Sequence, residues 1–414
     1  MMTMKVAIVN SAFHPRIVGG IESYLSNVVP TLAQHVTIVV ITGPLGVGHP
    51  TKSDGFLDHL RVHELDLGNR YPIWDWRNHS APARALWQML DARDPSVERQ
   101  LMTCLKEEDP DVVHTNNLRG LSLSALRLPA RLGIPHVHTL HDFLLLSPSS
   151  NLGFVGLTIS ADWIPNRIYQ TRTRILTRKI GSVVAPSKYI LDEHSHRGFF
   201  PDSSKFVLRM PRVSRVTNRE ISIPLETEGL SSYPRPWFLF VGILEESKGV
   251  KVLLHAIRTM PLARATFHFA GAGRLTQLLS KSAMVDPRIK FHGELPNAQL
   301  PWLYKHCDAL IFPSVGPENS PMVLYEALSF GLPVIASKVG GVPELISQGI
   351  GVLIKPGSVQ DLAGAISRTI ENYGREAVTR TENIQGTPLP SLEQHVWRLI
   401  EIYKMAAGVP ASGR

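Results

Sequence analysis

Residues 5–42 read KVAIVNSAFHPRIVGGIESYLSNVVPTLAQHVTIVVIT and place a glycine pair and a helical pattern between two apolar runs. Both runs are rich in valine and isoleucine, whereas the stretch between them repeats apolar side chains at helical spacing. Such alternation is typical of a βαβ unit, in which a helix joins two parallel strands. We therefore predict a parallel sheet that is covered by helices on both faces.

The same alternation continues along the chain and restarts once. Residues 218–236 hold three prolines and few large apolar side chains, and a new apolar run begins at Trp237. We predict a Rossmann-like domain over 1–217, a linker over 218–236, a second Rossmann-like domain over 237–386, and a C-terminal helix with its tail over 387–414 that packs on the first domain. The predicted strands and helices are Lys5–Asn10, Glu22–Ala33, Val36–Thr42, Asp111–Thr115, His136–Thr139, Trp237–Val241, Val250–Thr259, Thr266–Ala270, Arg274–Ser282, Ile289–His292, Ala309–Phe312, Pro321–Ser329, Val334–Ala336 and Val359–Asn372.

The predicted fold class also indicates where a ligand binds. Ligands of open parallel sheets lie beyond the carboxyl ends of the strands. Two doubly wound domains that face each other direct both of these edges toward one interdomain crevice. We therefore expect the functional site in that crevice.

Composition excludes several function classes. The chain has 414 residues, of which 43% are apolar and 19% are charged, as in ordinary globular proteins. Its net charge of +8 suits phosphorylated small molecules, anionic lipid or nucleic acid. Nucleic acid is not an expected partner, because the sequence holds no RNP-like aromatic motif and no dense basic helix.

The cysteines and the apolar runs bear on location. Cys104 and Cys307 are far apart and show no C-x-x-C spacing, so we expect neither a disulfide scaffold nor a zinc site. The apolar run near the N-terminus is too short for a signal peptide, and no window is apolar enough for a membrane span. We expect a cytoplasmic protein, with any contact to an anionic membrane peripheral and at its inner face.

The most informative stretch is GPENSPMVLYEALSFGLPVIAS, residues 316–337. Ser320 is a good N-cap and Pro321 a good first helical residue, so a helix is predicted to open there with unsatisfied N–H groups. Such an end is a seat for an anion. Glu318 precedes the cap and Glu326 lies inside the helix, so one carboxylate could bind a sugar and the other a ribose. An ordinary surface helix with a nearby acid is the alternative.

The spacing of Glu318 and Glu326 around NSPMVLY, followed by GLPVIASKVGGVPELI, resembles the E-x7-E region of retaining glycosyltransferases of the GT-B fold, in particular family 4 of the group 1 type. The resemblance covers nearly the whole chain. Further stretches agree in order: RIVGGIESYLSNV, DVVHTNN, HTLHDF, VVAPSKYI, VGILEESKGVKVLLHAI, FAGAGRLTQLL, KFHGEL and SLEQHVWRLIEIY.

The resemblance implies a role for each candidate site residue. Glu318 would bind hydroxyls of the transferred sugar, and Glu326 would bind the ribose of a nucleotide diphosphate sugar. Lys248 would neutralise the departing diphosphate, and His141 would face the donor sugar. The remaining donor-binding residues implied are Gly19, Gly20, Gly242, Asn319, Ser320, Met322 and Val323.

The sequence departs from the family pattern at two places. Where the family usually has an arginine five positions before the lysine, this chain has Ile243. Either Arg16 or Arg212 supplies the missing cation, or the chain is slow or inactive. The segment LRMPRVS, residues 208–214, also differs from the I-P-N-G that relatives commonly carry, so that loop has no clear family counterpart.

Neither a metal nor another cofactor is expected. Asp109 and Asp111 form a D-x-D string, but a strand follows directly, so we interpret it as a polar turn between helix and strand. The segment FAGAGRL lacks the third glycine of a dinucleotide fingerprint.

These observations lead to one favoured function and two alternatives. We expect a retaining hexosyltransferase that moves a sugar from a nucleotide diphosphate sugar to a saccharide, a lipid-linked acceptor or a small hydroxyl compound in polysaccharide or glycoconjugate biosynthesis. The alternatives are a sugar-nucleotide epimerase of the same fold and a sugar-nucleotide-binding protein with weak or no catalysis.

Overall fold

The computed structural model describes residues 3–16, 19–45, 60–67, 75, 79–150, 161–212, 233–346, 350–373 and 389–409. The chain divides into two compact units. The first comprises Met1–Leu152, Ser160–Met210 and Pro390–Arg414, and the second comprises Gly153–Ile159 and Pro211–Leu389. This division falls a few residues before the boundary predicted at 217, and most of the predicted linker lies outside the described residues.

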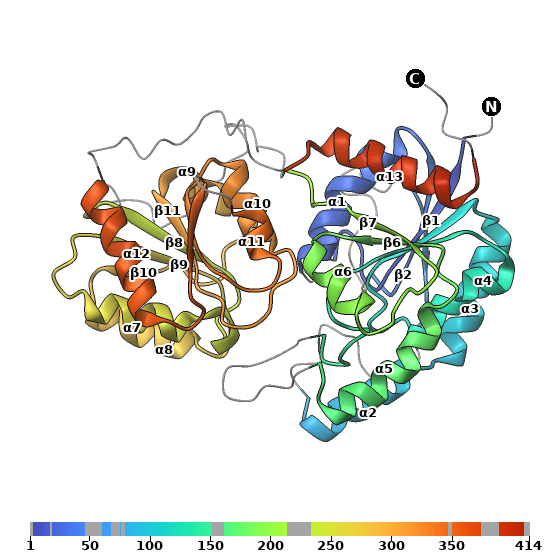
Figure 1. The fold of residues 1–414 in the computed structure, drawn as a ribbon, viewed down its shortest axis with the longest axis horizontal. Coiled ribbons are helices and arrows are strands. Elements are labelled where there is room, and N and C mark those ends of the chain that lie inside the picture. Colours follow the sequence, from blue (N-terminus) through green and yellow to red (C-terminus); the bar gives the residue numbers. More distant parts are fainter. Residues whose placement is uncertain are drawn as a thin grey trace. The chain divides into compact units, whose positions relative to one another are not determined.

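In the described part of the first unit, seven parallel strands form one sheet in the order β3-β2-β1-β4-β5-β6-β7 (Figure 1). β1 lies between β2 and β4, with Val9 opposite both Ile41 and Thr115. The strand order therefore reverses at β1: β2 and β3 lie on one side of it, and β4 to β7 lie on the other. Ligands of such sheets bind near the strand where the order reverses. The strands are β1 (Lys5–Asn10), β2 (Thr37–Thr42), β3 (Arg61–Glu64), β4 (Val112–Thr115), β5 (His136–Thr139), β6 (Ser182–Ala185) and β7 (Ser204–Val207).

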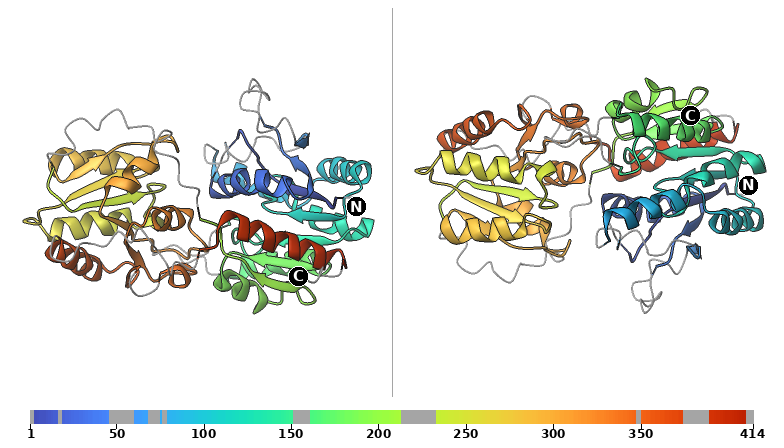
Figure 2. Two further views of the ribbon diagram at one scale, coloured as in Figure 1. Left: turned by 90° about the horizontal axis from the view of Figure 1, so that it is seen from above. Right: turned by 90° about the horizontal axis from the view of Figure 1, so that it is seen from below.

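Helices cover both faces of this sheet (Figure 2). The last helix of the chain belongs to this unit, where the Tyr24 hydroxyl on α1 donates to Nε2 of His395 at 2.8 Å. Nδ1 of His395 donates in turn to the carbonyl oxygen of Arg209 at 2.9 Å, which fixes the tautomer. The helices are α1 (Gly20–Ala33), α2 (Ala81–Asp91), α3 (Pro95–Glu108), α4 (Leu128–Leu132), α5 (Ile164–Thr177), α6 (Lys188–Ser195) and α13 (Leu392–Ala406).

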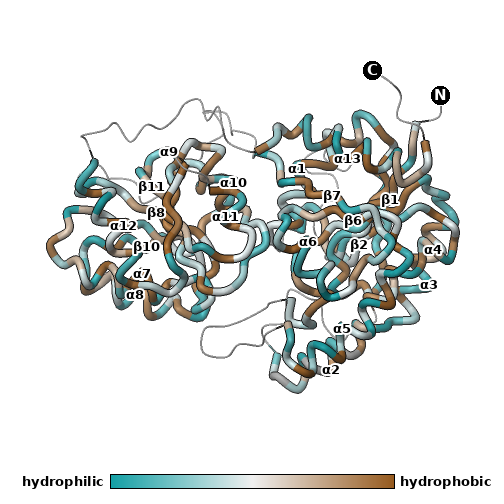
Figure 3. Tube along the Cα trace, viewed as in Figure 1, coloured by the Kyte–Doolittle hydropathy of each residue, from teal (hydrophilic) through white to brown (hydrophobic). Residues whose placement is uncertain are grey.

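The second unit repeats the architecture with six parallel strands among its described residues, in the order β10-β9-β8-β11-β12-β13. Its central strand β8 is apolar along its length (Figure 3), as expected for a strand that is buried on both faces. The strands are β8 (Trp237–Val241), β9 (Thr266–Ala270), β10 (Ile289–Phe291), β11 (Ala309–Phe312), β12 (Val334–Ser337) and β13 (Gly351–Ile354). The helices are α7 (Val250–Thr259), α8 (Thr276–Val285), α9 (Leu300–His306), α10 (Met322–Ser329), α11 (Val342–Leu345) and α12 (Val359–Asn372), and a 3₁₀ turn, Glu246–Lys248, precedes α7.

The predicted fold class of two Rossmann-like units is confirmed, and most of the predicted elements lie within two residues of their observed limits. The apolar strand residues form the core of each unit, for example Val9 in the first and Leu239 in the second. The first sheet also buries imidazoles. Burial lowers the pKa of His114 and of His136 to about 3, so both rings are neutral at neutral pH.

Candidate functional site

Glu318 lies in the loop between β11 and α10 and is held from three sides. Its Oε1 accepts hydrogen bonds from the Lys248 ammonium, at 2.6 Å, and from the Ser314 hydroxyl. Its backbone carbonyl accepts a hydrogen bond from the N–H of Gly341 at 2.8 Å. Gly340 has a φ of +52°, and a Cβ there would lie 1.9 Å from the same carbonyl oxygen. The position of Glu318 is therefore fixed, and its charge is balanced by Lys248 without a ligand.

Lys248 is held in place by the 3₁₀ turn that it ends. The carbonyl oxygen of Ser247 in this turn accepts a hydrogen bond from the N–H of Val315, at 2.8 Å, in the loop after β11. The next residue, Gly249, has a φ of +73°, and a Cβ there would lie 1.9 Å from the carbonyl oxygen of the residue that follows β11. The two loops thus meet backbone to backbone, which brings Lys248 to Glu318 across 70 positions of sequence.

The loops after β8 and β9 also meet at the backbone. The N–H of Leu244 donates to the carbonyl oxygen of Ala272, and the N–H of Leu275 donates to that of Leu244, both at 2.9 Å. Ile243, at the position where the resemblance expects an arginine, is exposed in this pair of loops. Arg274 precedes Leu275 and is also exposed, and its guanidinium forms no hydrogen bond or ion pair with any residue that the structure describes. A cation is therefore present in the loop beside Ile243.

The N-terminus of α10 differs in detail from the prediction. Pro321 is its N-cap, and the Ser320 hydroxyl is hydrogen bonded to the Tyr325 hydroxyl at 2.6 Å, so the prediction of a serine cap was wrong. The N–H groups of Met322 and Val323 have no acceptor among the described residues. Unsatisfied N–H groups and the helix dipole both favour an anion at this end. The backbone there can hold a phosphate group.

Glu326 lies one turn further along α10 and is oriented by a buried tyrosine. Its Oε2 accepts a hydrogen bond from the Tyr304 hydroxyl at 2.5 Å. Tyr304 lies on α9 and stacks on Phe330, with ring centroids 5.7 Å apart. Burial raises the pKa of Glu326, and the hydrogen bond from Tyr304 partly offsets this shift. One carboxylate oxygen is thus engaged, and the other can accept hydrogen bonds from hydroxyl groups of a ligand.

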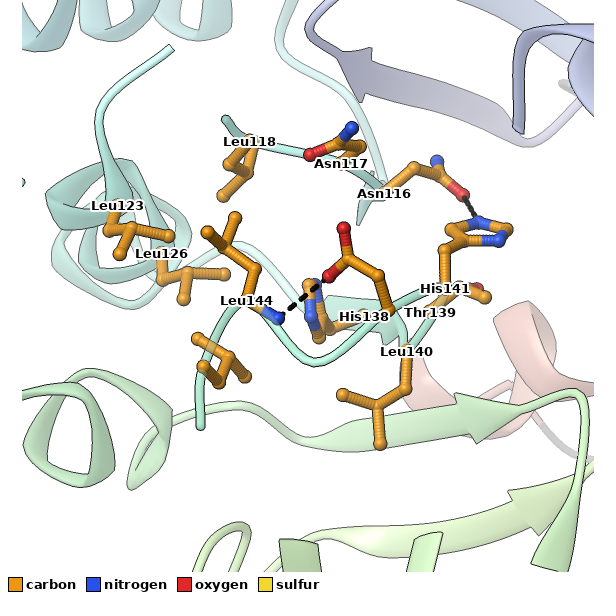
Figure 4. Close-up of a pocket in the computed structure, with 12 residues that line it drawn as sticks. Asn116, Asn117, Leu118, Leu123, Leu126, His138, Thr139, Leu140, His141 and Leu144 are labelled. Carbon is orange, nitrogen blue, oxygen red and sulfur yellow. Dashed lines mark hydrogen bonds between the residues drawn. The ribbon is translucent and has the colours of Figure 1, made fainter. Parts of the chain in front are cut away.

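His141 lies just beyond the carboxyl end of β5 in the first unit (Figure 4). Its Nε2 donates to Oδ1 of Asn116 at 2.9 Å. Burial, helped by the nearby imidazoles of His114 and His395, lowers the pKa of His141 to about 3, so the ring carries no charge at neutral pH. A cavity of about 20 Å³ beside it, lined in part by Asp142, has room for about one water molecule. His141 is thus a neutral, oriented polar group.

The glycine pair predicted to approach phosphate forms the start of α1. Gly19 is the N-cap in an extended conformation, and Gly20 is the first helical residue. A Cβ on Gly19 would come no closer than 3.8 Å to other atoms, to Glu22, so neither conformation nor packing requires glycine there. The N–H of Gly19 already donates to Oε2 of Glu22 at 2.8 Å. One of the amides predicted for phosphate binding is therefore engaged by an internal carboxylate.

The two arginines predicted to replace the missing cation both bind backbone carbonyl oxygens. Nε of Arg16 donates to Leu45 at 3.1 Å, and Nε of Arg212 donates to Leu389 at 3.2 Å. Their proposed role stays a prediction, and residues 213–214 of the unusual LRMPRVS segment lie outside the described residues.

The D-x-D string is a turn between helix and strand, as predicted. Asp109 ends α3 with a φ of +44°. Oδ2 of Asp111 accepts a hydrogen bond from the N–H of Lys5 at 2.7 Å. Within the described ranges, no group of three His, Cys, Asp or Glu side chains is placed to hold a metal ion.

Sequence reasoning missed Ser314 and Tyr304, which hold the two carboxylates of this site, and it did not single out Arg274, in the loop beside Ile243. Ser314 lies just past the carboxyl end of β11, a position from which polar side chains reach ligands, so the strand prediction itself could have indicated it. Tyr304 carries no such signal, because its contact with Glu326 depends on how α9 and α10 pack.

Comparisons with known proteins match both units. The sequence family described as "Glycosyltransferase Family 4" matches residues 18–207, and the family described as "Glycosyl transferases group 1" matches residues 228–385. An uncharacterized glycosyltransferase of Methanocaldococcus jannaschii is 24% identical over 97% of this chain and 98% of its own length. A glycogen synthase of Mycobacterium tuberculosis is 25% identical over 89% of this chain and 86% of its own length.

Solved structures share the fold at lower identity. HepE of Anabaena in complex with UDP and glucose has a TM-score of 0.69 and 19% identity, covering 97% of this chain and all of its own. Trehalose 6-phosphate synthase of Burkholderia multivorans has a TM-score of 0.70 and 12% identity over the full length of both chains. With the two families matching most of its length, the chain belongs to the group 1 glycosyltransferases of the GT-B fold and is an enzyme of the hexosyltransferase class.

Proposed function

We propose that the chain transfers a sugar from a nucleoside diphosphate sugar to a hydroxyl acceptor with retention of anomeric configuration. One observation carries the proposal: Glu318, paired with Lys248, lies in the loop that leads into α10, whose first N–H groups have no described acceptor, and Glu326 lies one turn into that helix. The crystal structures of HepE with UDP and with UDP-glucose, which share this fold, support a nucleotide sugar as the donor.

The geometry suggests how such a donor would lie on the second unit. The N–H groups of Met322 and Val323 and the Lys248 ammonium would bind the diphosphate, because unsatisfied amides at a helix N-terminus and an ammonium both attract an anion. The free oxygen of Glu326 would accept hydrogen bonds from the ribose. Glu318, already oriented, would accept hydrogen bonds from hydroxyls of the sugar.

In the proposed reaction, the bond between the anomeric carbon and the phosphate oxygen breaks, and the acceptor oxygen bonds to that carbon on the same face. The proton of the acceptor hydroxyl passes to the leaving phosphate oxygen. Glu318 is engaged by Lys248 and Ser314, which suits a positioning role rather than that of a nucleophile. The chain's own groups supply the charge compensation, so we propose that no metal is needed.

The acceptor is proposed from the relatives. One is described as a protein in the cps region of Klebsiella pneumoniae, and another as the O-antigen chain mannosyltransferase B of Escherichia coli. We infer an acceptor that is a saccharide or a lipid-linked saccharide in polysaccharide or glycoconjugate biosynthesis.

The place of action is also a proposal. None of the helices in the described part of the chain is both long enough and apolar enough to span a bilayer. Cys104 and Cys307 are both free thiols, which suits the reducing cytoplasm. We propose a cytoplasmic enzyme that contacts the inner face of an anionic membrane peripherally.

Ile243 favours a second candidate function. Without the arginine that the family usually has there, the donor site holds one cation fewer. The second candidate is therefore a protein that binds a sugar nucleotide but transfers its sugar weakly or not at all. Arg274, in the adjoining loop, is our candidate for the substitute cation, because backbone hydrogen bonds hold its loop against that of Ile243.

A panel of nucleotide sugars tests both candidates. A donor at 100 times its dissociation constant would stabilise the chain by about 2.7 kcal/mol, which raises the melting temperature measurably. The donor found in this way is then incubated with saccharide acceptors, and the anomeric configuration of the product is read by NMR. Inversion would refute the proposed mechanism, and binding without any transfer or release of nucleotide would favour the second candidate.

A further inference from the structure

Helix α5 of the first unit exposes an apolar stripe. Ile164 is 71% exposed, Ile168 is 69% exposed and Ile175 is 47% exposed. These residues are spaced i, i+4 and i+11, so they lie along one side of the helix. Trp163, at the start of the helix, is half exposed as well.

The opposite face of α5 is polar and buried. Nε2 of Gln170 donates to the carbonyl oxygens of Leu146, at 3.0 Å, and Ala161, at 2.7 Å. The Thr173 hydroxyl donates to the carbonyl oxygen of Leu145 at 2.8 Å. Turning the helix to bury its isoleucines would break these hydrogen bonds and leave buried polar groups unsatisfied. The outward orientation of the apolar stripe is therefore fixed by the fold.

Cations flank the stripe, and from Ile164 to Lys179 the sequence holds no acidic residue. By helical spacing, Arg167, Arg174 and Arg178 lie on one side of the stripe, and Arg172 and Lys179 lie on the other. The side chains of Arg167, Arg178 and Lys179 make no ion pair with any other described residue. In Figure 3, α5 accordingly alternates between apolar and polar segments along its length.

We propose that this face of α5 docks on the surface of an anionic phospholipid bilayer. The isoleucines would enter the boundary between headgroups and acyl chains, and the cations would bind lipid phosphates on either side. A tryptophan at the end of such a helix suits the same boundary. The charge of this face favours an anionic bilayer over other partners, because the cations on both sides of the stripe, with no acidic residue between them, complement an anionic surface.

Helix α2 carries two further exposed leucines, Leu86 and Leu90. It ends beside α5, where Nη2 of Arg172 donates to the carbonyl oxygen of Ala92 at 3.4 Å. Figure 1 shows the two helices next to each other. Docking through α5 rests on the peripheral membrane contact proposed above and not on sugar transfer, so the test needs no donor and its failure leaves the proposed transfer reaction untouched.

The test is co-sedimentation of the full chain with vesicles of phosphatidylcholine mixed with phosphatidylglycerol, and with vesicles of phosphatidylcholine alone. We expect binding to the mixed vesicles that weakens with added salt. The variant Arg167→Gln with Arg178→Gln should bind about 25-fold more weakly, at about fivefold for each cation. Ile164→Ser with Ile168→Ser should weaken binding by at least about tenfold.

The control lies on the second unit. Met284 and Val285, at the end of α8, are both 85% exposed, so Met284→Ser with Val285→Ser removes a similar exposed apolar area without touching α5. It should bind vesicles like the unchanged chain.

A blue shift of tryptophan fluorescence on vesicle addition should diminish in Trp163→Phe. Melting temperatures show that each variant is folded.

Four results would overturn the proposal. The first is absence of binding to the mixed vesicles, and the second is equal binding to both vesicle types. The third is loss of binding in the α8 variant but not in the α5 variants, which would place the contact on the second unit. The fourth is self-association of the unchanged chain that Ile164→Ser with Ile168→Ser abolishes without altering vesicle binding, which would make the face an interface between copies.

Discussion

The Lys248 ammonium lies 2.6 Å from Oε1 of Glu318, and this ion pair joins the loop after β8 to the loop after β11. The two charges neutralise each other before a donor arrives. A diphosphate would therefore share the ammonium with Glu318 rather than meet an isolated cation. This arrangement keeps both side chains in place, which is how a binding site avoids reorganisation during the reaction.

We predict that Lys248→Met lowers turnover by about 10²- to 10³-fold, as loss of one preorganised donor does elsewhere. Lys251→Met is the matched control, because Lys251 pairs with Glu246 on the outer side of the same turn and is exposed. It should leave turnover within about twofold, since exposed pairs contribute little. The measurement is transfer rate at saturating donor. Similar losses in both variants would show that the turn, and not the Lys248 charge, matters.

Two glycines with nearly the same backbone conformation should respond differently to alanine. Gly249 has a φ of +73° and a Cβ there would lie 1.9 Å from a carbonyl oxygen, whereas Gly293 has a φ of +67° and open space. We expect Gly293→Ala to lower the free energy of unfolding by about 1 kcal/mol from conformation alone. Gly249→Ala should cost several kcal/mol and also reduce donor binding. Denaturant titration checks this, and equal costs would contradict the close approach.

Replacing the Glu326 carboxylate should lower donor affinity without lowering the stability of the fold. Its pKa is raised in the folded chain, so the ionised form destabilises the fold at neutral pH, and this cost disappears as pH falls through the raised pKa. Glu326→Gln should therefore leave the melting temperature at neutral pH unchanged or higher, while donor affinity falls. In the unchanged chain, donor affinity should fall on acidification, because a protonated carboxyl accepts hydrogen bonds less well.

Tyr304→Phe separates the orientation of Glu326 from its charge. It removes the hydrogen bond to Oε2 but keeps the ring that stacks on Phe330. We expect the pKa of Glu326 to rise further, so that the loss of donor affinity on acidification begins at higher pH. Calorimetric titrations of donor across pH measure this. An unchanged pH profile would refute the influence of Tyr304 on the carboxylate.

Strands such as β1, from Lys5 to Asn10, could be predicted because they are buried on both faces, so their residues are almost continuously apolar. The exposed edge strands β3 and β7 carry no such signal. The cap of α10 could not be predicted, because the Ser320 hydroxyl bonds to the side chain of Tyr325 instead of the backbone. The contact of Lys248 with Glu318 depends on β8 lying beside β11, which only the strand order shows. Helix periodicity would also have buried Ile164, because sequence alone does not show the carbonyl oxygens that hold Gln170 inward.

Chelation should leave activity unchanged. The positive groups proposed to face the diphosphate are the α10 amides and Lys248, which belong to the chain itself. We expect transfer in the presence of EDTA to match transfer without it. Complete loss with the chelator, restored by magnesium or manganese, would contradict this prediction and return attention to Asp109 and Asp111.

The last prediction concerns the cation that Ile243 does not supply. If Arg274 supplies it from the adjoining loop, Arg274→Gln should lower turnover by about 10²-fold, because one positive group would be lost from the diphosphate site. Ile243→Arg should change little in the unchanged chain but restore much of the activity of Arg274→Gln. Lys281→Gln, on α8 and also exposed, is the control for a general loss of charge.

The same measurement decides among the earlier candidates. Arg16→Gln and Arg212→Gln should be nearly silent if Arg274 is the substitute, since both guanidinium groups bind backbone carbonyl oxygens. A large loss in either one, with Arg274→Gln silent, would assign the role to that arginine instead. If all three are silent and Ile243→Arg raises turnover, no substitute exists, and the chain is a slow enzyme because a single lysine carries the charge of the leaving diphosphate.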